Sequence, residues 1–301
     1  MPILAARPVP LGGIRAMEVR RTLPHRERTT VGPWIFCDQY GPEKTTMDVA
    51  PHPHTGLATV SWLFTGEIRH DDTAGNHTQV LPGELNMMTA GHGIAHTEVS
   101  KSEWLHGVQL WLAYPKDQRS LDRRLQHYAP KPEKIGVATV LLFMGSLPGF
   151  TPSPIDAPKR ALGAEVRLPS TRSVQLPVDK TLEYAVLADT EPLEVNGDRL
   201  EPGDLWYVDP GIENLHITNL GKDTRVIILG GEPFNEDVVM FWNFIGTDHA
   251  EVAQQRADWE DPETRAIRFG NVEGYTGEGE RIPAPPVPGV LMRPRGNRRL
   301  R

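Results

Sequence analysis

Residues 57–113 consist of short apolar segments separated by glycine and proline turns, and this pattern strongly constrains the fold. The segments at 57–63, 78–81, 85–89 and 106–113 are rich in valine, threonine, tryptophan and leucine, and each is too short for an ordinary helix. Gly66 and Pro82-Gly83 mark turns between them. With 28 glycines and 28 prolines in 301 residues, the chain is predicted to be all-β, built from antiparallel barrels or sandwiches.

The two halves of the chain share an internal repeat. A Pro-Gly-acid-Leu turn, a glycine and a histidine recur with a constant displacement of 120 residues: Pro82-Gly83-Glu84-Leu85, Gly91 and His96 match Pro202-Gly203-Asp204-Leu205, Gly211 and His216. The constant offset indicates duplication of one structural unit. We therefore expect two tandem β-barrels, with domains at residues 1–134 and 135–301 and a polar linker at 114–136.

The region after the second barrel has a different character. Asp248 is a suitable N-cap for a helix from His249 to about Trp259. The proline-rich segment 283–288 is expected to end the ordered structure. The tail that follows is predicted to be disordered and basic, with Arg293, Arg295, Arg298, Arg299 and Arg301.

Two pairs of potential metal ligands lie in the first half. His52-Pro53-His54 and His96-Thr97-Glu98 each have the spacing i, i+2, which puts both side chains on the same face of a β-strand. Two such strands would bring three imidazoles and one carboxylate to one point. A buried glutamate beside three histidines is costly unless it is paired or bound to a cation, and a metal removes that cost.

The donor types restrict the metal without fixing it. Cys37 is the single cysteine, so a cysteine-rich structural zinc site and an internal disulfide are both excluded. Three imidazoles and a carboxylate suit Fe(II), Mn, Ni, Cu or Zn. The second half has Thr218 where the first has Glu98, and no histidine lies between His127 and His216. A single metal site would therefore belong to the first barrel.

The remaining candidates carry less information. His92 could lie at the mouth of a pocket or support a ligand through a hydrogen bond. His70 and His77 bracket a hairpin and are predicted to be exposed. Cys37 is expected to be a small buried hydrophobic residue. Trp62, Phe64, Met87 and Met88 are expected in the core.

Several of these segments together resemble the pirin family of the cupin superfamily. The resemblance rests on HPHTGLATV from residue 52, the Pro82-Gly83 turn, MTAGHGIAHTE from residue 88, and GGEPFNEDVVMFWNF from residue 230. It covers residues 13–260 and implies a bicupin: two cupin-type jelly-roll barrels with a short C-terminal helix. The resemblance also implies that His52, His54, His96 and Glu98 bind the metal in the N-terminal barrel.

The resemblance implies an Fe(II) protein of one of two kinds. One is a quercetin 2,3-dioxygenase-type enzyme that opens a flavonol ring with O2, with Glu98 taking the hydroxyl proton. The other is a non-catalytic, redox-sensing regulator that binds a transcription factor or metabolic enzyme. A cupin that processes a sugar or small acid with another divalent metal is a third possibility. Ala58, Met87 and His92 depart from the family pattern, and these changes alter the pocket wall rather than the ligands.

Charge and hydropathy limit the partners. The net charge is −7, which argues against direct nucleic-acid binding through bulk positive charge. No apolar run approaches the roughly 18 residues of a membrane span. The N-terminal MPILAARPVPLGG is too short and too rich in proline for the core of a signal peptide. These features lead us to expect a cytoplasmic protein.

Overall fold

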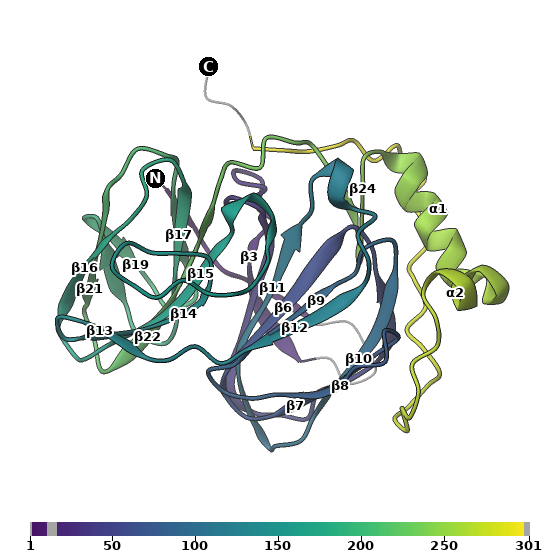
Figure 1. Cartoon of the computed structure of the whole chain (residues 1–301), viewed down its shortest axis with the longest axis horizontal. Coiled ribbons are helices and arrows are strands. Elements are labelled where there is room, and N and C mark those ends of the chain that lie inside the picture. Colours follow the sequence, from purple (N-terminus) through teal and green to yellow (C-terminus); the bar gives the residue numbers. More distant parts are fainter. Residues whose placement is uncertain (1, 11–16, 298–301) are drawn as a thin grey trace. The chain divides into compact units, whose positions relative to one another are not determined.

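The computed structural model describes residues 2–10 and 17–297 and shows a mostly β protein (Figure 1). Its residue contacts form two compact units, each assembled from separate stretches of the chain. Unit 1 comprises residues 1–8, 20–39 and 128–234, and unit 2 comprises residues 9–19, 40–127 and 235–301. The division between the units therefore falls inside β2 (Arg7–Pro10), β3 (Glu18–Leu23), β4 (Trp34–Lys44) and β12 (Arg124–Tyr128).

Unit 2 contains a four-stranded sheet with the order β5-β10-β7-β8. It is formed by β5 (Asp48–His54), β10 (Ile94–Ser100), β7 (Ile68–Asp72) and β8 (His77–Val80). A seven-stranded sheet has the order β12-β9-β6-β11-β4-β3-β2. Its strands are β12 (Arg124–Tyr128), β9 (Leu85–Thr89), β6 (Leu57–Thr65), β11 (Trp104–Ala113), β4 (Trp34–Lys44), β3 (Glu18–Leu23) and β2 (Arg7–Pro10).

Unit 1 repeats this plan. Its four-stranded sheet has the order β16-β21-β18-β19, with β16 (Ser173–Pro177), β21 (Asn214–Asn219), β18 (Leu193–Val195) and β19 (Asp198–Leu200). Its seven-stranded sheet has the order β1-β20-β17-β22-β15-β14-β13. These strands are β1 (Ile3–Leu4), β20 (Leu205–Val208), β17 (Glu183–Ala188), β22 (Thr224–Gly231), β15 (Leu162–Leu168), β14 (Ala138–Met144) and β13 (Glu133–Ile135).

Each unit is a jelly-roll sandwich whose core lies between its two sheets. In unit 1 alternate residues of the four-stranded sheet, such as Leu215 and Ile217, are fully buried in one apolar cluster with Trp206 and Tyr184. Two jelly rolls in tandem confirm the predicted all-β, bicupin fold. Two short 3-10 helices, Lys116–Gln118 and Pro158–Arg160, lie outside the sheets.

The predicted turn of the repeat is present in both units. The backbone N–H of Gly83 donates to Leu63, and that of Gly203 donates to Ala188, each on the neighbouring strand of its seven-stranded sheet. Both glycines have a positive φ, +76° and +88°, which only glycine adopts at little cost. The Pro-Gly pair therefore fixes the same corner of the fold twice.

The C-terminal part of unit 2 folds as a hairpin and two helices. The hairpin pairs β23 (Val239–Phe241) with β24 (Phe244–Gly246). Helix α1 (His249–Glu260) confirms the predicted helix, and the Asp248 side chain caps it by accepting from the N–H of Glu251. Helix α2 (Pro262–Arg268) was not predicted, although Asp261 caps it and Pro262 occupies its first turn.

These helices pack on the unit that contains the histidine pairs. Val252, Trp259 and Phe269 share an apolar cluster with Ala95 of β10, and Figure 1 shows α1 and α2 beside the β10 strand. The contacts thus group the described residues 235–297 with the first jelly roll, whereas the sequence predicts that they belong to a domain at 135–301. The domain boundary at 134/135 stays a prediction.

The predicted linker at 114–136 is wrong in part, because residues 124–128 and 133–135 form strands of the seven-stranded sheets. Within the predicted tail, the backbone of Arg295 exchanges two hydrogen bonds with Val238, so ordered pairing continues beyond residue 288. Arg298, Arg299 and Arg301 lie outside the described residues.

Candidate metal centre

The candidate metal centre lies on the inward face of the four-stranded sheet of unit 2. Strand β10 is central, and the antiparallel register places His96 directly opposite His52 on β5 and Asp72 on β7. Glu98, two residues further along β10, lies opposite His70. Residues paired across antiparallel strands point to the same face, so these five side chains share one surface. All five are buried, with at most 8% of any residue exposed.

Three imidazoles converge within this surface. Donor nitrogens of His52, His54 and His96 all lie within 4.8 Å of one another. The Nε2 atoms of His54 and His96 are 3.1 Å apart, and the rings of His52 and His96 have centroids 4.3 Å apart. The i, i+2 spacing on β5 produces this convergence, as predicted.

Glu98 belongs to a neighbouring group that shares one histidine with the first. Donor atoms of His70, His96 and Glu98 lie within 4.8 Å of one another. The structure thus brings the three predicted histidines together and places the predicted carboxylate next to one of them, His96. The complete set of four ligands stays a prediction.

Burial keeps the imidazoles neutral. Loss of hydration lowers the pKa of His52 to about 4, although the hydrogen bond to the Ala50 carbonyl partly opposes this effect. Burial, together with the neighbouring imidazoles, lowers the pKa values of His54 and His96 well below the ordinary value. Neutral imidazoles at physiological pH have free lone pairs, which is the form that binds a metal.

Burial acts on Glu98 in the opposite direction. It raises the pKa of the Glu98 carboxyl, and the electrostatic influence of His70 and a hydrogen bond from Ser61 partly offset this rise. The Ser61 hydroxyl lies 3.3 Å from Glu98 Oε1 and comes from β6 in the opposite sheet. A buried carboxylate with so little compensation would be stabilised by a nearby cation.

The hydrogen bonds of the imidazoles leave nitrogens free for a ligand. His52 Nδ1 donates to the Ala50 carbonyl at 2.9 Å, because a carbonyl can only accept, so its Nε2 retains a lone pair. Among the described residues, the buried His54 Nδ1 has no hydrogen-bond partner. A buried set of neutral nitrogens beside a carboxylate fits a divalent transition metal.

His70 and Asp72 are the residues that sequence reasoning missed. The prediction that His70 is exposed is wrong: it is 3% exposed, because β7 turns its even-numbered residues inward. His70 Nδ1 is 3.3 Å from His96 Nδ1, and its Nε2 is 3.2 Å from Asp72 Oδ2. The signal was available, since His70-Asp71-Asp72 has the same i, i+2 spacing as the two pairs that were chosen.

The other sequence candidates lie outside this cluster. The exposed position predicted for His77 is confirmed; its side chain points outward and pairs with Asp71 at 2.7 Å. His92 is exposed, and its carbonyl accepts from Arg268. Cys37 is fully buried, as predicted, and burial raises the pKa of its thiol to about 12. Trp62, Phe64, Met87 and Met88 are buried, in agreement with their predicted core positions.

The opposite sheet supplies the other wall of the site. The indole of Trp111 on β11 meets the His54 ring edge to face, with centroids 5.2 Å apart. The Ser61 hydroxyl, which has a single proton to donate to either Glu98 or Gln109, also lies 3.0 Å from the side-chain oxygen of Gln109 on β11. An aromatic side chain and two polar side chains thus face the histidines from across the sandwich.

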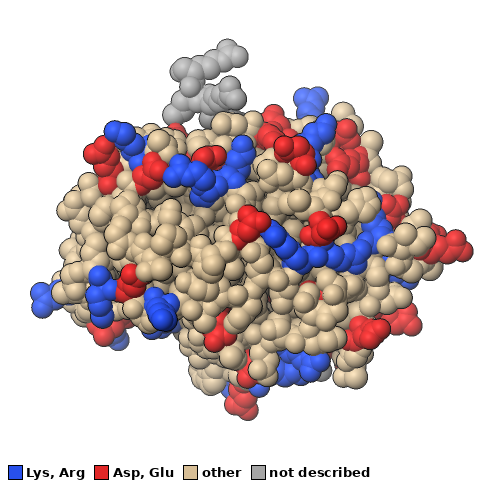
Figure 2. Space-filling model, viewed as in Figure 1, with Lys and Arg blue, Asp and Glu red and all other residues tan. Residues whose placement is uncertain are grey.

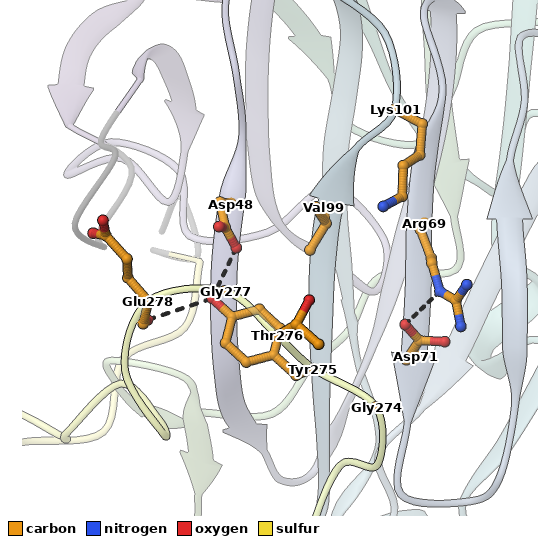
Figure 3. A pocket seen from close by; sticks show the side chains of 10 residues that line it. All are labelled: Asp48, Arg69, Asp71, Val99, Lys101, Gly274, Tyr275, Thr276, Gly277 and Glu278. Atoms are coloured by element: carbon orange, nitrogen blue, oxygen red, sulfur yellow. Dashed lines mark hydrogen bonds and ion pairs between the residues drawn. The ribbon is translucent and has the colours of Figure 1, made fainter.

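A pocket lies on the reverse, outward face of the same strands (Figure 3). It has a volume of about 530 Å³, within the usual range for small-molecule sites. Val99 on β10 lies in register with Asp48 on β5 and with Arg69 on β7, and Lys101 also lines the pocket. The segment 274–278 covers it, anchored where the Tyr275 hydroxyl donates to Asp48 at 2.8 Å.

The surface charge is mixed. On the face shown in Figure 2, Lys and Arg side chains alternate with Asp and Glu side chains. No helix within residues 2–10 and 17–297 is long and apolar enough to cross a membrane.

Comparisons with known proteins agree with this geometry. Residues 15–112 match the family model named Pirin, and residues 163–265 match the Pirin C-terminal cupin domain. A Pseudomonas aeruginosa protein provisionally named a quercetin 2,3-dioxygenase is 36% identical over 95% of this chain and 90% of its own length. A pirin-like protein of Caulobacter vibrioides is 32% identical over 80% of this chain and 88% of its own.

Solved structures give the same result. The crystal structure of quercetin 2,3-dioxygenase from Acinetobacter baumannii superposes with a TM-score of 0.88 at 30% identity and covers 97% of both chains. The bacterial pirin of Escherichia coli in complex with nickel(II) shares the fold at 17% identity, with a TM-score of 0.60 over 77% of this chain and 98% of its own. On the strength of both family models and of relatives that align along most of its length, the chain belongs to the pirin family.

Proposed function

We propose that the protein is a metal-dependent dioxygenase of the quercetin 2,3-dioxygenase type, which opens the ring of a flavonol with O2. The observation that carries this proposal is the buried group of three neutral imidazoles, His52, His54 and His96, beside the carboxyl of Glu98. Such a donor set can hold one transition metal and leave coordination positions open for substrate.

The proposed ligands are His52, His54, His96 and Glu98, and the proposed metal is Fe(II). Mn, Ni, Cu and Zn fit the same nitrogen and oxygen donors. The nickel(II) in the Escherichia coli pirin supports a divalent transition metal within this fold. The approach of His54 Nε2 to His96 Nε2 at 3.1 Å and the burial of Glu98, which raises the pKa of its carboxyl, further support a cation here.

The chain's own groups suit the chemistry of a flavonol. When bound, the ion supplies Lewis acidity toward the flavonol hydroxyl and a site for the reduction of O2. Glu98 accepts the hydroxyl proton, since burial raises the pKa of its carboxyl and thereby makes it a better base. Trp111, which lies against His54, offers a flat apolar wall for an aromatic ring.

The substrate class rests on the relatives. A relative at 36% identity and a solved structure at 30% identity both bear the name quercetin 2,3-dioxygenase, and both align over nearly the whole chain. We therefore propose that the protein acts on a flavonol-like substrate together with O2. We also propose that it does so in the cytoplasm.

Aerobic turnover of quercetin by Fe(II)-loaded protein, with release of CO and consumption of O2, tests this proposal. We expect turnover by the natural chain and a loss of about 10²- to 10⁴-fold in kcat for Glu98→Gln, the range for removal of a catalytic base. His77→Gln, an outward-facing histidine on the same sheet, should keep full activity. Absence of turnover at full iron occupancy would exclude the dioxygenase.

The alternative is a non-catalytic regulator whose iron redox state changes a surface read by a protein partner. The outward pocket favours this alternative because it shares strand β7 with the candidate metal centre. Arg69 and Asp71 of the pocket alternate along that strand with His70 and Asp72 of the inward face. It predicts different hydrogen exchange of residues 274–278 in the Fe(II) and Fe(III) states, without flavonol turnover. Identical hydrogen exchange of residues 274–278 in the Fe(II) and Fe(III) states would exclude the regulator.

A further inference from the structure

The carboxylate of Asp72 is held at the end of β7 by the turn that follows it. Its Oδ1 accepts from the backbone N–H of Ala74 at 2.8 Å, the backbone N–H of Asn76 at 3.1 Å and the Asn76 side-chain amide at 3.0 Å. The same amide is 3.0 Å from Oδ2. With these donors around it, the Asp72 carboxylate is fixed in position and acts as an acceptor.

This carboxylate determines which nitrogen of His70 carries the proton. Asp72 Oδ2 lies 3.2 Å from His70 Nε2, and because the carboxylate accepts, Nε2 must donate. In the neutral imidazole the remaining nitrogen, Nδ1, is then an acceptor. His70 Nδ1 lies 3.3 Å from His96 Nδ1, which must therefore donate.

The consequence reaches the metal centre. If Nδ1 of His96 carries the proton, its Nε2 retains a lone pair, and this atom faces His54 Nε2 at 3.1 Å. The orientation is the one that a metal-binding histidine needs, and such histidines usually donate their other N–H to a carboxylate, carbonyl or water. Here an extra imidazole stands between the carboxylate and the ligand.

We propose that Asp72 and His70 are positioning residues that hold His96 in the tautomer with a bare Nε2, ready to bind the metal. The proposal rests on the metal centre of the proposed function, but not on the reaction. It assigns a role to two buried residues outside the proposed ligand set. In this chain of hydrogen bonds His96 donates to His70, and His70 donates to Asp72.

A matched control exists one residue away. Asp71 and His77 form the same kind of pair, with Asp71 Oδ1 2.7 Å from His77 Nδ1, but on the outward face of the same hairpin. Asp71→Asn therefore replaces the aspartate partner of a histidine, as Asp72→Asn does, but leaves the hydrogen bonds from His96 to His70 and from His70 to Asp72 unchanged. Asp72→Asn changes the inward chain, because an asparagine amide can donate to His70 Nε2 and so reverse both tautomers.

The first experiment reads the tautomers directly in metal-free, full-length protein labelled with ¹⁵N, by long-range ¹H–¹⁵N correlation of the imidazoles. We expect the proton on Nδ1 of His96 and on Nε2 of His70. In Asp72→Asn we expect the proton of His96 to move to Nε2, while Asp71→Asn leaves it on Nδ1. A proton on Nε2 of His96 in the natural chain would overturn the proposal.

The second experiment measures Ni(II) affinity by competition with a chelator. Asp72→Asn and His70→Leu should each bind Ni(II) about 10- to 100-fold more weakly, the usual cost of losing such a supporting partner. Asp71→Asn should bind like the natural chain. Equal affinity of Asp72→Asn and Asp71→Asn, with circular dichroism showing both folded, would also overturn the proposal.

The two experiments separate this inference from the proposed function. A chain that fails to turn over quercetin yet shows the expected tautomers and loss of Ni(II) affinity would retain the inference and lose the dioxygenase. If Asp72→Asn does not fold, the tautomers of the natural chain alone decide, since they require no variant.

Discussion

The two four-stranded sheets of this protein share one plan and differ in what their central strands carry inward. In unit 1, Ile217 of β21 lies opposite Val174 on β16 and Val195 on β18. In unit 2, His96 of β10 lies opposite His52 on β5 and Asp72 on β7. One row across the sheet is therefore aliphatic and closes a core, whereas its counterpart is polar and forms a candidate metal centre.

The comparison teaches that the jelly roll does not need the polar row. The aliphatic row of unit 1 is fully buried, or nearly so, within its apolar cluster, and burial of this kind is the main driving force for folding. Three imidazoles and a carboxylate in the corresponding place of unit 2 cost stability unless they bind something. The frame belongs to the fold, and the polar row to the function.

Replacing the polar row with the aliphatic one should produce the largest effect. In His52→Val/His96→Ile we expect metal binding more than about 100-fold weaker, because two of the proposed ligands are gone. The free energy of unfolding of the metal-free protein should stay equal or rise, since apolar side chains replace buried polar ones. Metal content and urea denaturation check both parts. Retained metal in the folded variant would contradict the assignment.

Acid should destabilise the polar row and spare the aliphatic one. A lowered histidine pKa means that the unfolded chain takes up protons first, so stability is complete above the ordinary pKa of 6.5 and falls as the pH drops toward the folded value, about 4 for His52. That shift corresponds to about 3 kcal/mol for His52 alone. Hydrogen exchange of metal-free protein at pH 7 and pH 5 should show faster opening of β5 and β10 than of β16 and β21.

The double variant His52→Val/His96→Ile is the control for this pH dependence. Its free energy of unfolding should change less between pH 7 and pH 5 than that of the natural chain. Equal slopes would show that other groups cause the acid sensitivity.

The converse substitution tests whether unit 1 tolerates a polar row. Ile217→His buries an imidazole among aliphatic side chains without a partner, and we expect a loss of about 2–4 kcal/mol in the free energy of unfolding and no gain in metal. His216→Gln, on the exposed side of the same strand, should change stability by less than about 0.5 kcal/mol. Urea denaturation of both variants decides; equal effects would contradict the difference between the faces.

The smallest expected effect concerns the contact between the two sheets of unit 2. Ser61→Ala removes the hydroxyl that lies 3.3 Å from Glu98. Loss of one hydrogen bond of about 0.5–1.5 kcal/mol predicts Ni(II) affinity about 2- to 10-fold weaker. Ser173→Ala in unit 1 should leave the affinity unchanged. An unchanged affinity in Ser61→Ala would show that Glu98 does not depend on this contact.

Much of the fold follows from local sequence patterns. The Pro-Gly turns, the short alternating segments and the Asp248 cap predicted the strands, the repeat and helix α1, because each is a local preference of the backbone. The i, i+2 pairs predicted the three converging histidines for the same reason. Family resemblance added the jelly-roll class.

The predictions that failed concerned which face of a polar strand points inward. In Arg69-His70-Asp71-Asp72 every residue is polar, so the alternation that identifies a buried face gives no signal, and His70 was assigned to the surface. The repeat failed at a similar point. His216 keeps the offset of 120 residues from His96, yet it is exposed, while Leu215 and Ile217 face the core. A shift of one residue exchanges the faces of a strand.

The central claim is that the inward face of the four-stranded sheet of unit 2 holds one metal ion per chain through His52, His54 and His96 with Glu98. The most direct test uses full-length protein purified without added metal. Mass spectrometry measures its metal content, and X-ray absorption at the metal edge identifies the ligands. We predict about one ion per chain with imidazole and carboxylate ligands, and its loss in folded His52→Val/His96→Ile. A metal-free chain that also fails to bind added Fe(II) or Ni(II), or an ion retained by that variant, would contradict the claim.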